Sequence, residues 1–485
     1  MGIVQTQAFK NTITTYLGFG IGAINALFLY TNFMSETYYG LIAFILSTAN
    51  IMMPLMAFGV HNTLVKFYSS YKTRNNINSF LTLILFLPLL LIIPIGLVGY
   101  FSFDVISDFL AQKNVIIKDY VWLIYLTAIA FAYFEIFYAW TKVQMKSVFG
   151  NFMKEVFHRA AVMLLLFALY FEWLTINQFI KAVVGVYILR MFIMKLYAYY
   201  LRRPVIRFGK IPDLKAVLKY SALIIIAGSV GGIILEIDKF MIGELLTINN
   251  VAYYGVAIYI ASVIGVPARS MHQITNPITA KLLNENNTSE LEILYKKSSL
   301  NLFIISGFIF LLIVLNINQL YALIKPEYST ALFVVFIVSI AKLSDNVIGN
   351  NNAILFNSNY YRIVLLFGVL LAILAVVLNL LLIPEYGING AAFATFLSVL
   401  VYNIAKLLFV YLKYKISPFT SNTLKTLVLI IIMVVLFYYW ELQFHPILNI
   451  ALKSIVITTI YVFVVYKMQL SEDISRLIDK VIKRK

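Results

Sequence analysis

Long apolar stretches dominate the sequence. Runs of about 20 mostly hydrophobic residues recur along it and are separated by short polar breaks. A helix of about 20 residues crosses the roughly 30 Å hydrocarbon core of a bilayer. The pattern therefore predicts an all-α polytopic membrane protein with about fourteen transmembrane helices. The predicted spans are residues 11–33, 39–65, 80–101, 120–141, 150–170, 178–201, 220–240, 251–273, 300–317, 331–349, 363–383, 387–412, 424–440 and 447–466.

Composition excludes a water-soluble fold. Hydrophobic residues make up 62% of the chain and charged residues 12%, whereas soluble domains have about 45–50% apolar and about 25% charged residues. The chain has no cysteine, its 4 histidines are scattered, and no Gly-x-x-x-x-Gly-Lys-Ser/Thr phosphate loop occurs. We therefore expect no metal site, no cofactor and no ATP hydrolysis, and the chain is not expected to be an enzyme.

The net charge of +17 is spread over short loops. Basic residues fill alternate loops, as in the run from Arg202 to Lys215, while the other loops carry mainly acids, such as Glu172 and Glu327. The positive-inside rule makes the basic loops cytoplasmic and places both termini inside. This dispersal also argues against a nucleic-acid partner, which would require a single basic surface.

Two stretches share a pattern that indicates an internal repeat. Each has a Gly-x-x-x-Gly pair, a Tyr-Tyr-Gly triplet and then a proline, at residues 18–22, 38–40 and 54 and again at 228–232, 253–255 and 267. Repeats are a common plan for transporters, in which the substrate site lies between the halves. We expect an N-terminal six-helix bundle with a cytoplasmic linker (1–215), a C-terminal six-helix bundle (216–415), two additional transmembrane helices (416–470) and an amphipathic basic cytoplasmic tail (471–485). That tail either lies on the inner membrane surface or is simply a solvated helix.

Polar residues recur at helical spacing on the first, second and eighth spans. Such a face either packs tightly against another helix or lines a cavity, because hydrocarbon does not accept unpaired amides. The polar face of the eighth span contains Arg269, which is hard to explain by helix packing. The alternative is that Arg269 anchors the helix at the membrane interface. The candidate substrate contacts on these faces are Asn25, Asn50, His61, Lys66, Arg269, His272 and Gln273.

Charges within the spans are stronger signals, because they are costly in hydrocarbon. Arg190 lies near the middle of the sixth span without an acid in helical reach, so its counter-charge must come from another helix, such as Glu135, or from a ligand. Glu155 and Arg159 are four residues apart and are expected to pair with each other.

Further charges lie on the seventh and tenth spans. Lys342 is a candidate substrate contact, and its spacing also allows it to pair with Asp345. Basic groups slightly exceed acids within the spans, which favours an anionic substrate. The candidates for charge balance or ion coupling are Glu135, Glu236, Asp238 and Asp345.

One motif carries a family resemblance. The chain reads Leu-Ile-Pro-Glu-Tyr-Gly-Ile-Asn-Gly-Ala-Ala at residues 382–392, where Pro384 and Gly387 are expected to form a tight turn and Gly390 close helix packing. With the stretches at 58–68, 237–243 and 325–328, it resembles the polysaccharide transporters of the multidrug/oligosaccharidyl-lipid/polysaccharide flippase superfamily over essentially its full length.

This resemblance implies two six-helix bundles in a V around a central cavity, with two extra C-terminal helices. It also implies a flippase of the bacterial inner membrane that moves undecaprenyl-pyrophosphate-linked oligosaccharide units to the outer leaflet by alternating access, for a surface polysaccharide such as O-antigen. Membrane lipids, a polysaccharide polymerase and glycosyltransferases are the implied partners. A net-basic cavity suits a pyrophosphate, which arginine and lysine bind through charge-assisted hydrogen bonds.

Three alternatives remain open. A drug/cation antiporter of the same superfamily would need uncompensated acids in its cavity. A peptidoglycan-precursor flippase is less favoured, because such relatives tend to carry an arginine shortly after the second tyrosine pair, where this chain has Val256 and Ala257. A membrane enzyme would need a large outer loop or an interfacial histidine and acid, and the sequence shows neither.

Overall fold

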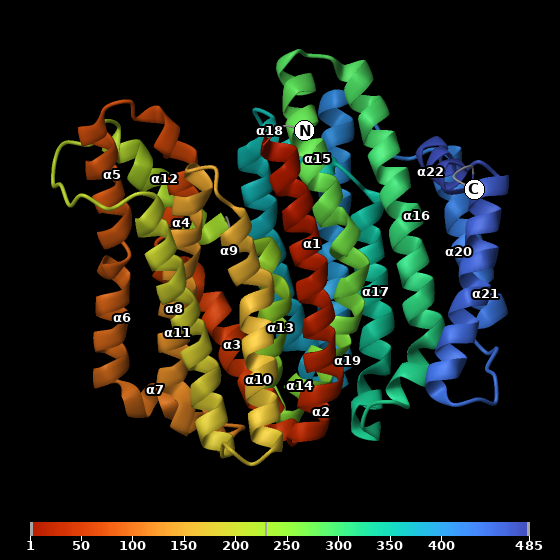
Figure 1. Cartoon of the computed structure of the whole chain (residues 1–485), viewed down its shortest axis with the longest axis horizontal. Coiled ribbons are helices and arrows are strands. Elements are labelled where there is room, and N and C mark those ends of the chain that lie inside the picture. Colours follow the sequence, from red (N-terminus) through yellow and green to blue (C-terminus); the bar gives the residue numbers. More distant parts are fainter. Residues whose placement is uncertain (1–2, 228–229, 483–485) are drawn as a thin grey trace. The chain divides into compact units, whose positions relative to one another are not determined.

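The computed structural model describes residues 3–227 and 230–482. Within these residues the regular structure is entirely helical. The chain divides into two compact units, Met1–Gly255 and Val256–Lys485, whose helices are labelled in Figure 1. The expected all-α architecture is therefore confirmed, and the domain bounds drawn from the sequence stay a prediction.

The first unit contains most of the short and interrupted helices. Its elements are α1 (Ile3–Ala23), η1 (Ile24–Leu29), α2 (Tyr30–Phe33), α3 (Glu36–Met56), α4 (Val60–Phe67), η2 (Tyr68–Ser70), α5 (Arg74–Phe86), α6 (Leu89–Phe101), α7 (Phe103–Leu110), η3 (Val115–Tyr120), α8 (Val121–Val143), α9 (Val148–Phe152), η4 (Met153–Phe157), α10 (His158–Tyr170), α11 (Ile176–Leu201), α12 (Leu214–Ala227), α13 (Val230–Leu245) and the first part of α14 (Asn249–Ser262).

The second unit contains the rest of α14 and both short and long helices. Its other elements are η5 (Val263–Gly265), α15 (Val266–Asn284), α16 (Thr288–Tyr321), η6 (Pro326–Ala331), α17 (Leu332–Val347), α18 (Asn351–Asn357), α19 (Tyr361–Tyr414), α20 (Ser421–Phe437), α21 (Pro446–Lys467) and α22 (Glu472–Ile482).

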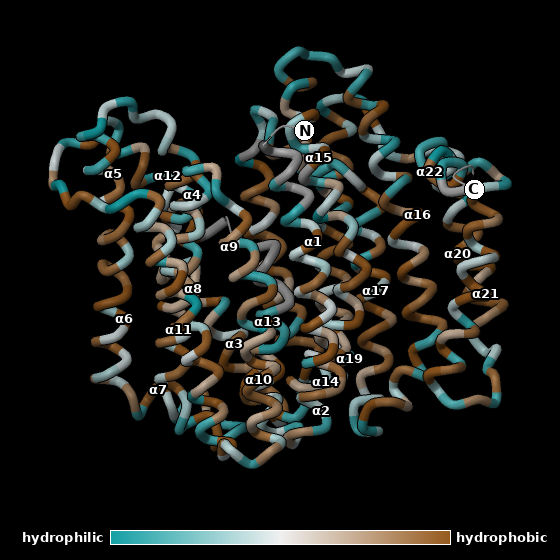
Figure 2. The backbone as a smooth tube through the Cα atoms, in the orientation of Figure 1, coloured by the Kyte–Doolittle hydropathy of each residue, from teal (hydrophilic) through white to brown (hydrophobic). Residues whose placement is uncertain are grey.

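Nine stretches among the described residues are long and apolar enough to cross a bilayer. Figure 2 shows hydrophobic residues along the middle of the helices and hydrophilic residues toward their ends. One of the nine, Arg362–Tyr414, contains two of the spans predicted from the sequence. A polytopic membrane fold is thus confirmed, while the total of fourteen spans stays a prediction.

A sharp bend divides α19 into two helices. Gly387 has φ 59° and ψ −139° inside this element, a conformation that favours glycine. A Cβ atom at Gly390 would lie 2.1 Å from the carbonyl oxygen of Leu382, so the chain after the bend packs directly against the chain before it. Ala391 and Ala392 beside it are fully buried. These observations confirm the turn and the close packing expected from the motif.

A second break separates α3 from α4. Pro54 lies near the end of α3, and Gly59 has φ 63° at the start of α4. A Cβ atom at Gly59 would meet the carbonyl oxygen of Ser221 on α12 at 2.4 Å, and the hydroxyls of Thr63 and Ser221 lie 2.7 Å apart. The break therefore brings α4 and α12 into close contact. Gly228 of the predicted repeat lies outside the described residues.

Each unit has its core around one helix. In the first unit α8 packs against α3, α4 and α11, and its Trp140 and Phe134 are buried. In the second unit α16 packs against α15, α17, α20 and α21. Several faces of α8 and α16 are thus covered by protein, and polar groups on them need protein or ligand partners.

Candidate functional site

Arg190 is a buried cation enclosed by aromatic rings. It lies on the face of α11 that packs against α8, and only 7% of its surface is exposed. The guanidinium carbon is 4.1 Å from the ring centre of Phe134, 4.9 Å from that of Tyr187 and 5.5 Å from that of Phe131. Its Nε atom has no hydrogen-bond partner, and no carboxylate forms an ion pair with it within the described chain. Ring faces stabilise the charge only partly, and a role of Arg190 in substrate contact stays a prediction.

Glu135 on α8, the expected counter-charge, binds another residue. Lys154 of η4 places its Nζ atom 2.6 Å from the Glu135 Oε1 atom. Glu135 still attracts Arg190 electrostatically without bonding to it. His61, half-buried on α4, is also close enough to feel the Glu135 charge. The structure thus brings together His61, Glu135, Lys154 and Arg190 from four helical elements.

Two π-helical turns, η1 and η4, connect the first span to α9 and α10 beside this cluster. η1 contacts α10, and η4 contacts α1, at a point where a Cβ atom on Gly18 would lie 2.3 Å from the carbonyl oxygen of Glu155. Asn25 of η1 donates to the carbonyl oxygen of Arg159 at 2.8 Å. Arg159 in turn donates to the Glu155 carboxylate at 3.1 Å, which confirms the pair predicted from spacing. Such π-helical turns occur frequently at functional sites.

Part of the polar stripe on the first span packs tightly against neighbouring helices. Asn11 donates to the hydroxyl of Ser147 at 3.2 Å, and Asn151 donates to the carbonyl oxygen of Asn11 at 3.1 Å. With the contacts of Gly18 and Asn25, these bonds show a helix contact at Asn11, Gly18 and Asn25. A role of Asn25 in substrate contact stays a prediction.

On the second span the candidates are spread along two helices. Asn50 is partly buried on α3, whereas Lys66 is exposed on α4. The Lys66 Nζ atom lies 3.9 Å from the ring centre of Tyr220 on α12, a cation–π contact. Neither residue approaches Arg190 in any described hydrogen bond or ion pair. Their assignment to substrate contact stays a prediction.

The acids of the seventh span have protein partners. Glu236 forms an ion pair with Lys239 at 2.7 Å, as their spacing of three on α13 allows. Asp238 is fully buried and accepts a 2.5 Å hydrogen bond from the hydroxyl of Tyr254 on α14. Each acid therefore has a protein partner, and a role of either acid in charge balance or ion coupling stays a prediction.

A second charged cluster lies in the second unit, and its central residue was not among the candidates predicted from the sequence. Lys406 on α19 is completely buried; its Nζ atom is 3.8 Å from Asp345 on α17 and donates to Asn352 on α18 at 3.0 Å. It also lies 4.1 Å from the ring centre of Tyr402. His272 on α15 is near enough to feel the charges of Asp345 and Lys406. A lysine within the predicted span 387–412 was the signal available in the sequence.

The remaining candidates lie on α15 and α17. Arg269 is exposed and Lys342 is partly buried. Gln273 is part of α15, and its side chain is not described. These three stay predicted substrate contacts.

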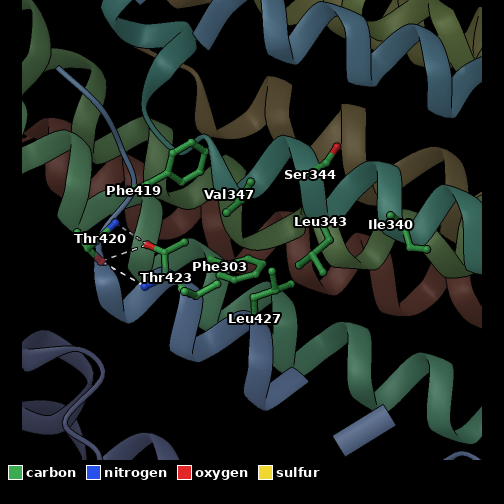
Figure 3. Close-up of a pocket in the computed structure, with 10 residues that line it drawn as sticks. Phe303, Ile340, Leu343, Ser344, Val347, Phe419, Thr420, Thr423 and Leu427 are labelled. Atoms are coloured by element: carbon green, nitrogen blue, oxygen red, sulfur yellow. Dashed lines mark hydrogen bonds between the residues drawn. The ribbon is translucent and has the colours of Figure 1, made fainter. Parts of the chain in front are cut away.

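An apolar pocket of about 460 Å³ opens beside α16, α17 and α20. Phe303, Leu343 and Leu427 contribute hydrocarbon walls, as Figure 3 shows, and the pair Thr420 and Thr423 lies at one end. These two threonines form the capping box of α20, so their polar groups are satisfied by each other. The pocket wall is therefore suited to an acyl or isoprenoid chain.

Residues 6–282, more than half of the chain, match the family described as "Polysaccharide biosynthesis protein". The chain belongs to this family. Residues 224–341 of the same chain also match the family described as "MatE". No curated protein sequence matches the chain.

Several solved structures share the fold of this chain. "Lipid II flippase MurJ, inward closed conformation" superposes with a TM-score of 0.72 at 13% identity, covering 95% of this chain and 99% of that one. An inward-facing multidrug resistance MATE family transporter of the MOP superfamily gives 0.57 at 12% identity, with 86% and 95% covered. A variant of the Vibrio cholerae MATE transporter VcmN gives 0.56 at 12%, with 86% and 98% covered. The fold is that of flippases and transporters rather than of enzymes.

Proposed function

We propose that the protein is a flippase that moves undecaprenyl-pyrophosphate-linked oligosaccharide units from the cytoplasmic to the outer leaflet by alternating access. The observation that carries this proposal is Arg190, buried among rings and forming no ion pair with a carboxylate of the described residues. A buried charge without a partner is strongly unfavourable, so an anionic ligand would stabilise it. A pyrophosphate suits this role, because the planar guanidinium binds two of its oxygens at once.

Two further features support a lipid-linked cargo. The family takes part in polysaccharide biosynthesis, and the second unit holds an apolar pocket of a size that accommodates part of a hydrocarbon chain. A phosphate-binding cation and an apolar pocket are the two elements that a lipid pyrophosphate requires. In this proposal the protein lies in the bacterial inner membrane with both termini cytoplasmic, and it works beside a polymerase and glycosyltransferases.

We assign charge balance or ion coupling to Glu135, Glu236, Asp238 and Asp345. Each acid already has a basic or hydroxyl partner, so its loss would leave a charge or donor uncompensated. Moving one net charge across the membrane is worth about 2.3 kcal/mol per 100 mV, which is enough to drive a transport step. Glu135 and Asp345 are the stronger choices, because each belongs to a cluster that also contains a histidine.

The test is made in cells. Deleting the gene should leave the lipid-linked unit facing the cytoplasm, and a plasmid copy should restore outward transfer. A copy with Arg190→Gln should fail to restore it, while Lys195→Gln, which removes a cation five residues further along α11, should succeed. Normal outward transfer in the deletion strain would overturn the proposal.

A drug/cation antiporter is the second candidate, because residues 224–341 match the MatE family and several MATE structures share the fold. A substitution at Glu236 distinguishes the two functions. A Glu236→Gln variant that loses drug efflux but keeps polysaccharide export would favour the antiporter.

Peptidoglycan-precursor transport is the third candidate, since the flippase MurJ shares the fold over 95% of this chain. Here the test is replacement of an essential lipid II flippase in a conditional strain. Growth supported by this chain would favour that substrate, whereas lysis together with restored surface polysaccharide would favour the oligosaccharide.

A further inference from the structure

The segment between α11 and α12 is fixed although it has no regular structure. Residues 203–211, here called the strap, are non-helical, yet they are bonded to α5. The backbone N–H of Arg207 donates to the hydroxyl of Thr82 at 3.0 Å, and that hydroxyl donates to the carbonyl oxygen of Val205 at 3.3 Å. Tyr71 donates to the carbonyl oxygen of Pro212 at 3.1 Å, just beyond the strap. Figure 1 shows the segment passing along the outer side of α5.

The strap lies along a membrane-spanning helix rather than beyond its end. The span Arg74–Phe101 includes α5, and the ring of Phe208 packs against Phe86 with ring centres 6.0 Å apart. Phe86 is twelve residues after the start of this span, which corresponds to about 18 Å of helix. Phe208 is therefore held at the depth of the apolar part of α5.

Arg207 reaches back toward the start of the span. Its backbone bonds to Thr82, but its guanidinium donates to the side chain of Asn75 at 2.7 Å, two turns nearer the helix start. A long basic side chain that runs from an apolar level to a polar one is the behaviour of arginine at a membrane interface. The strap thus has an apolar end and a polar end along α5.

Exposed side chains of the strap are of two kinds. Ile206 is 62% exposed and Phe208 is 85% exposed. Arg203 and Lys210 are exposed and form no hydrogen bond or ion pair within the described chain. No acid occurs from Arg202 to Pro212. Apolar groups fixed in an exposed position, flanked by cations, match a surface of anionic lipid, which accepts both.

We propose that the strap is a lipid-binding element: Ile206 and Phe208 insert among acyl chains, and Arg203 and Lys210 bind anionic phospholipid headgroups. The basic loops are cytoplasmic in the predicted orientation, so the lipids belong to the inner leaflet. This role goes beyond the proposed cargo and holds whichever substrate the protein carries. It also explains why the strap is bonded to α5 instead of extending into water.

Depth is the first test, and the chain suits it because it has no native cysteine. A spin label on Phe208→Cys, in vesicles of phosphatidylcholine and phosphatidylglycerol, should collide more often with oxygen than with a water-soluble nickel chelate. A label on Asn286→Cys, in the exposed turn after α15, should show the reverse. A water-exposed label at 208 would overturn the proposal and would favour a protein partner for the strap.

Headgroup preference is the second test. Native mass spectrometry of the full chain should show more phosphatidylglycerol than phosphatidylcholine retained, and Arg203→Gln with Lys210→Gln should lower that preference by about tenfold. The matched control is Lys113→Gln with Lys181→Gln, which removes the same charge from exposed positions away from the strap. An unchanged preference in the strap variant, or an equal loss in the control, would overturn the headgroup assignment.

Discussion

Lys154 lies 2.6 Å from Glu135, and Arg190 forms no ion pair with Glu135 or with another carboxylate of the described residues. Glu135 and Arg190 attract each other only through space. Lys154 is therefore paired with an acid, whereas Arg190 is surrounded by aromatic rings. Of these two cations, Arg190 is the one available to an anionic ligand.

Replacing Arg190 should separate transport from stability. Arg190→Met is expected to reduce flipping of a lipid-linked oligosaccharide in proteoliposomes by at least about tenfold, because the anion loses a charge-assisted partner. Its melting temperature should stay equal or rise, since an apolar group replaces a buried charge that forms no ion pair, and this gain exceeds the loss of the ring contacts. Lys195→Met is the control on the same helix and should transport normally. A fall in melting temperature with retained flipping would mean that Arg190 only stabilises packing.

Asp345 and Lys406 should behave as a coupled pair. Asp345→Asn removes the carboxylate near a completely buried ammonium and should lower stability by about 2 kcal/mol. Adding Lys406→Met should recover much of that loss, because the stranded charge is gone. The measurement is a double-mutant cycle on thermal unfolding of the purified protein. Strictly additive effects would show that the two residues do not interact.

Gly40 on α3 should not tolerate a methyl group. A Cβ atom there would lie 2.0 Å from the carbonyl oxygen of Ile248, a backbone atom that cannot move alone. We expect Gly40→Ala to cost about 1–3 kcal/mol, measured by thermal unfolding. Gly185→Ala, on α11 with open space around it, should instead gain about 0.5–1 kcal/mol. Equal effects at both positions would contradict the close approach of α3 to Ile248, which lies in the turn between α13 and α14.

Asn114 holds the turn between α13 and α14. Its side chain donates to the carbonyl oxygens of Gly243 at 2.6 Å and Leu246 at 2.9 Å, and it accepts from the N–H of Ile248 at 2.8 Å. Loss of these bonds in Asn114→Ala should cost about 2–3 kcal/mol. Asn114→Asp should be no better, because its carboxylate faces two carbonyl oxygens. Hydrogen exchange at residues 243–248 measures the effect, and Gln112→Ala, at an exposed position two residues before Asn114, should leave that exchange nearly unchanged.

Local spacing explains what the sequence predicted well. The Glu155–Arg159 pair and the bend at Gly387 depend on neighbours within a few positions, and both are present. The apolar runs likewise predicted helices that cross a membrane. The ion pair and the spans follow from the period of a single helix, and the bend follows from the turn residues Pro384 and Gly387.

Partners on different helices were beyond that reasoning. Lys154 and Glu135 are separated by 19 positions, and the turn at η4 that orients Lys154 has no sequence signature that we used. Lys406 was overlooked because its partner Asp345 had a nearer lysine, Lys342, at helical spacing. Nor does the basic run from Arg202 to Lys215 reveal that its backbone is bonded to α5.

The two π-helical turns have a consequence for how relatives are compared. A π-turn accommodates one residue more than an α-helical turn, so η4 amounts to a single-residue insertion within the helix that includes α9 and α10. Removing that residue would rotate everything after it by about 100° and would carry His158 and Arg159 to another face. Pairing this chain position by position with an α-helical homologue would therefore shift the charged cluster out of register, and homologues are best matched here in space.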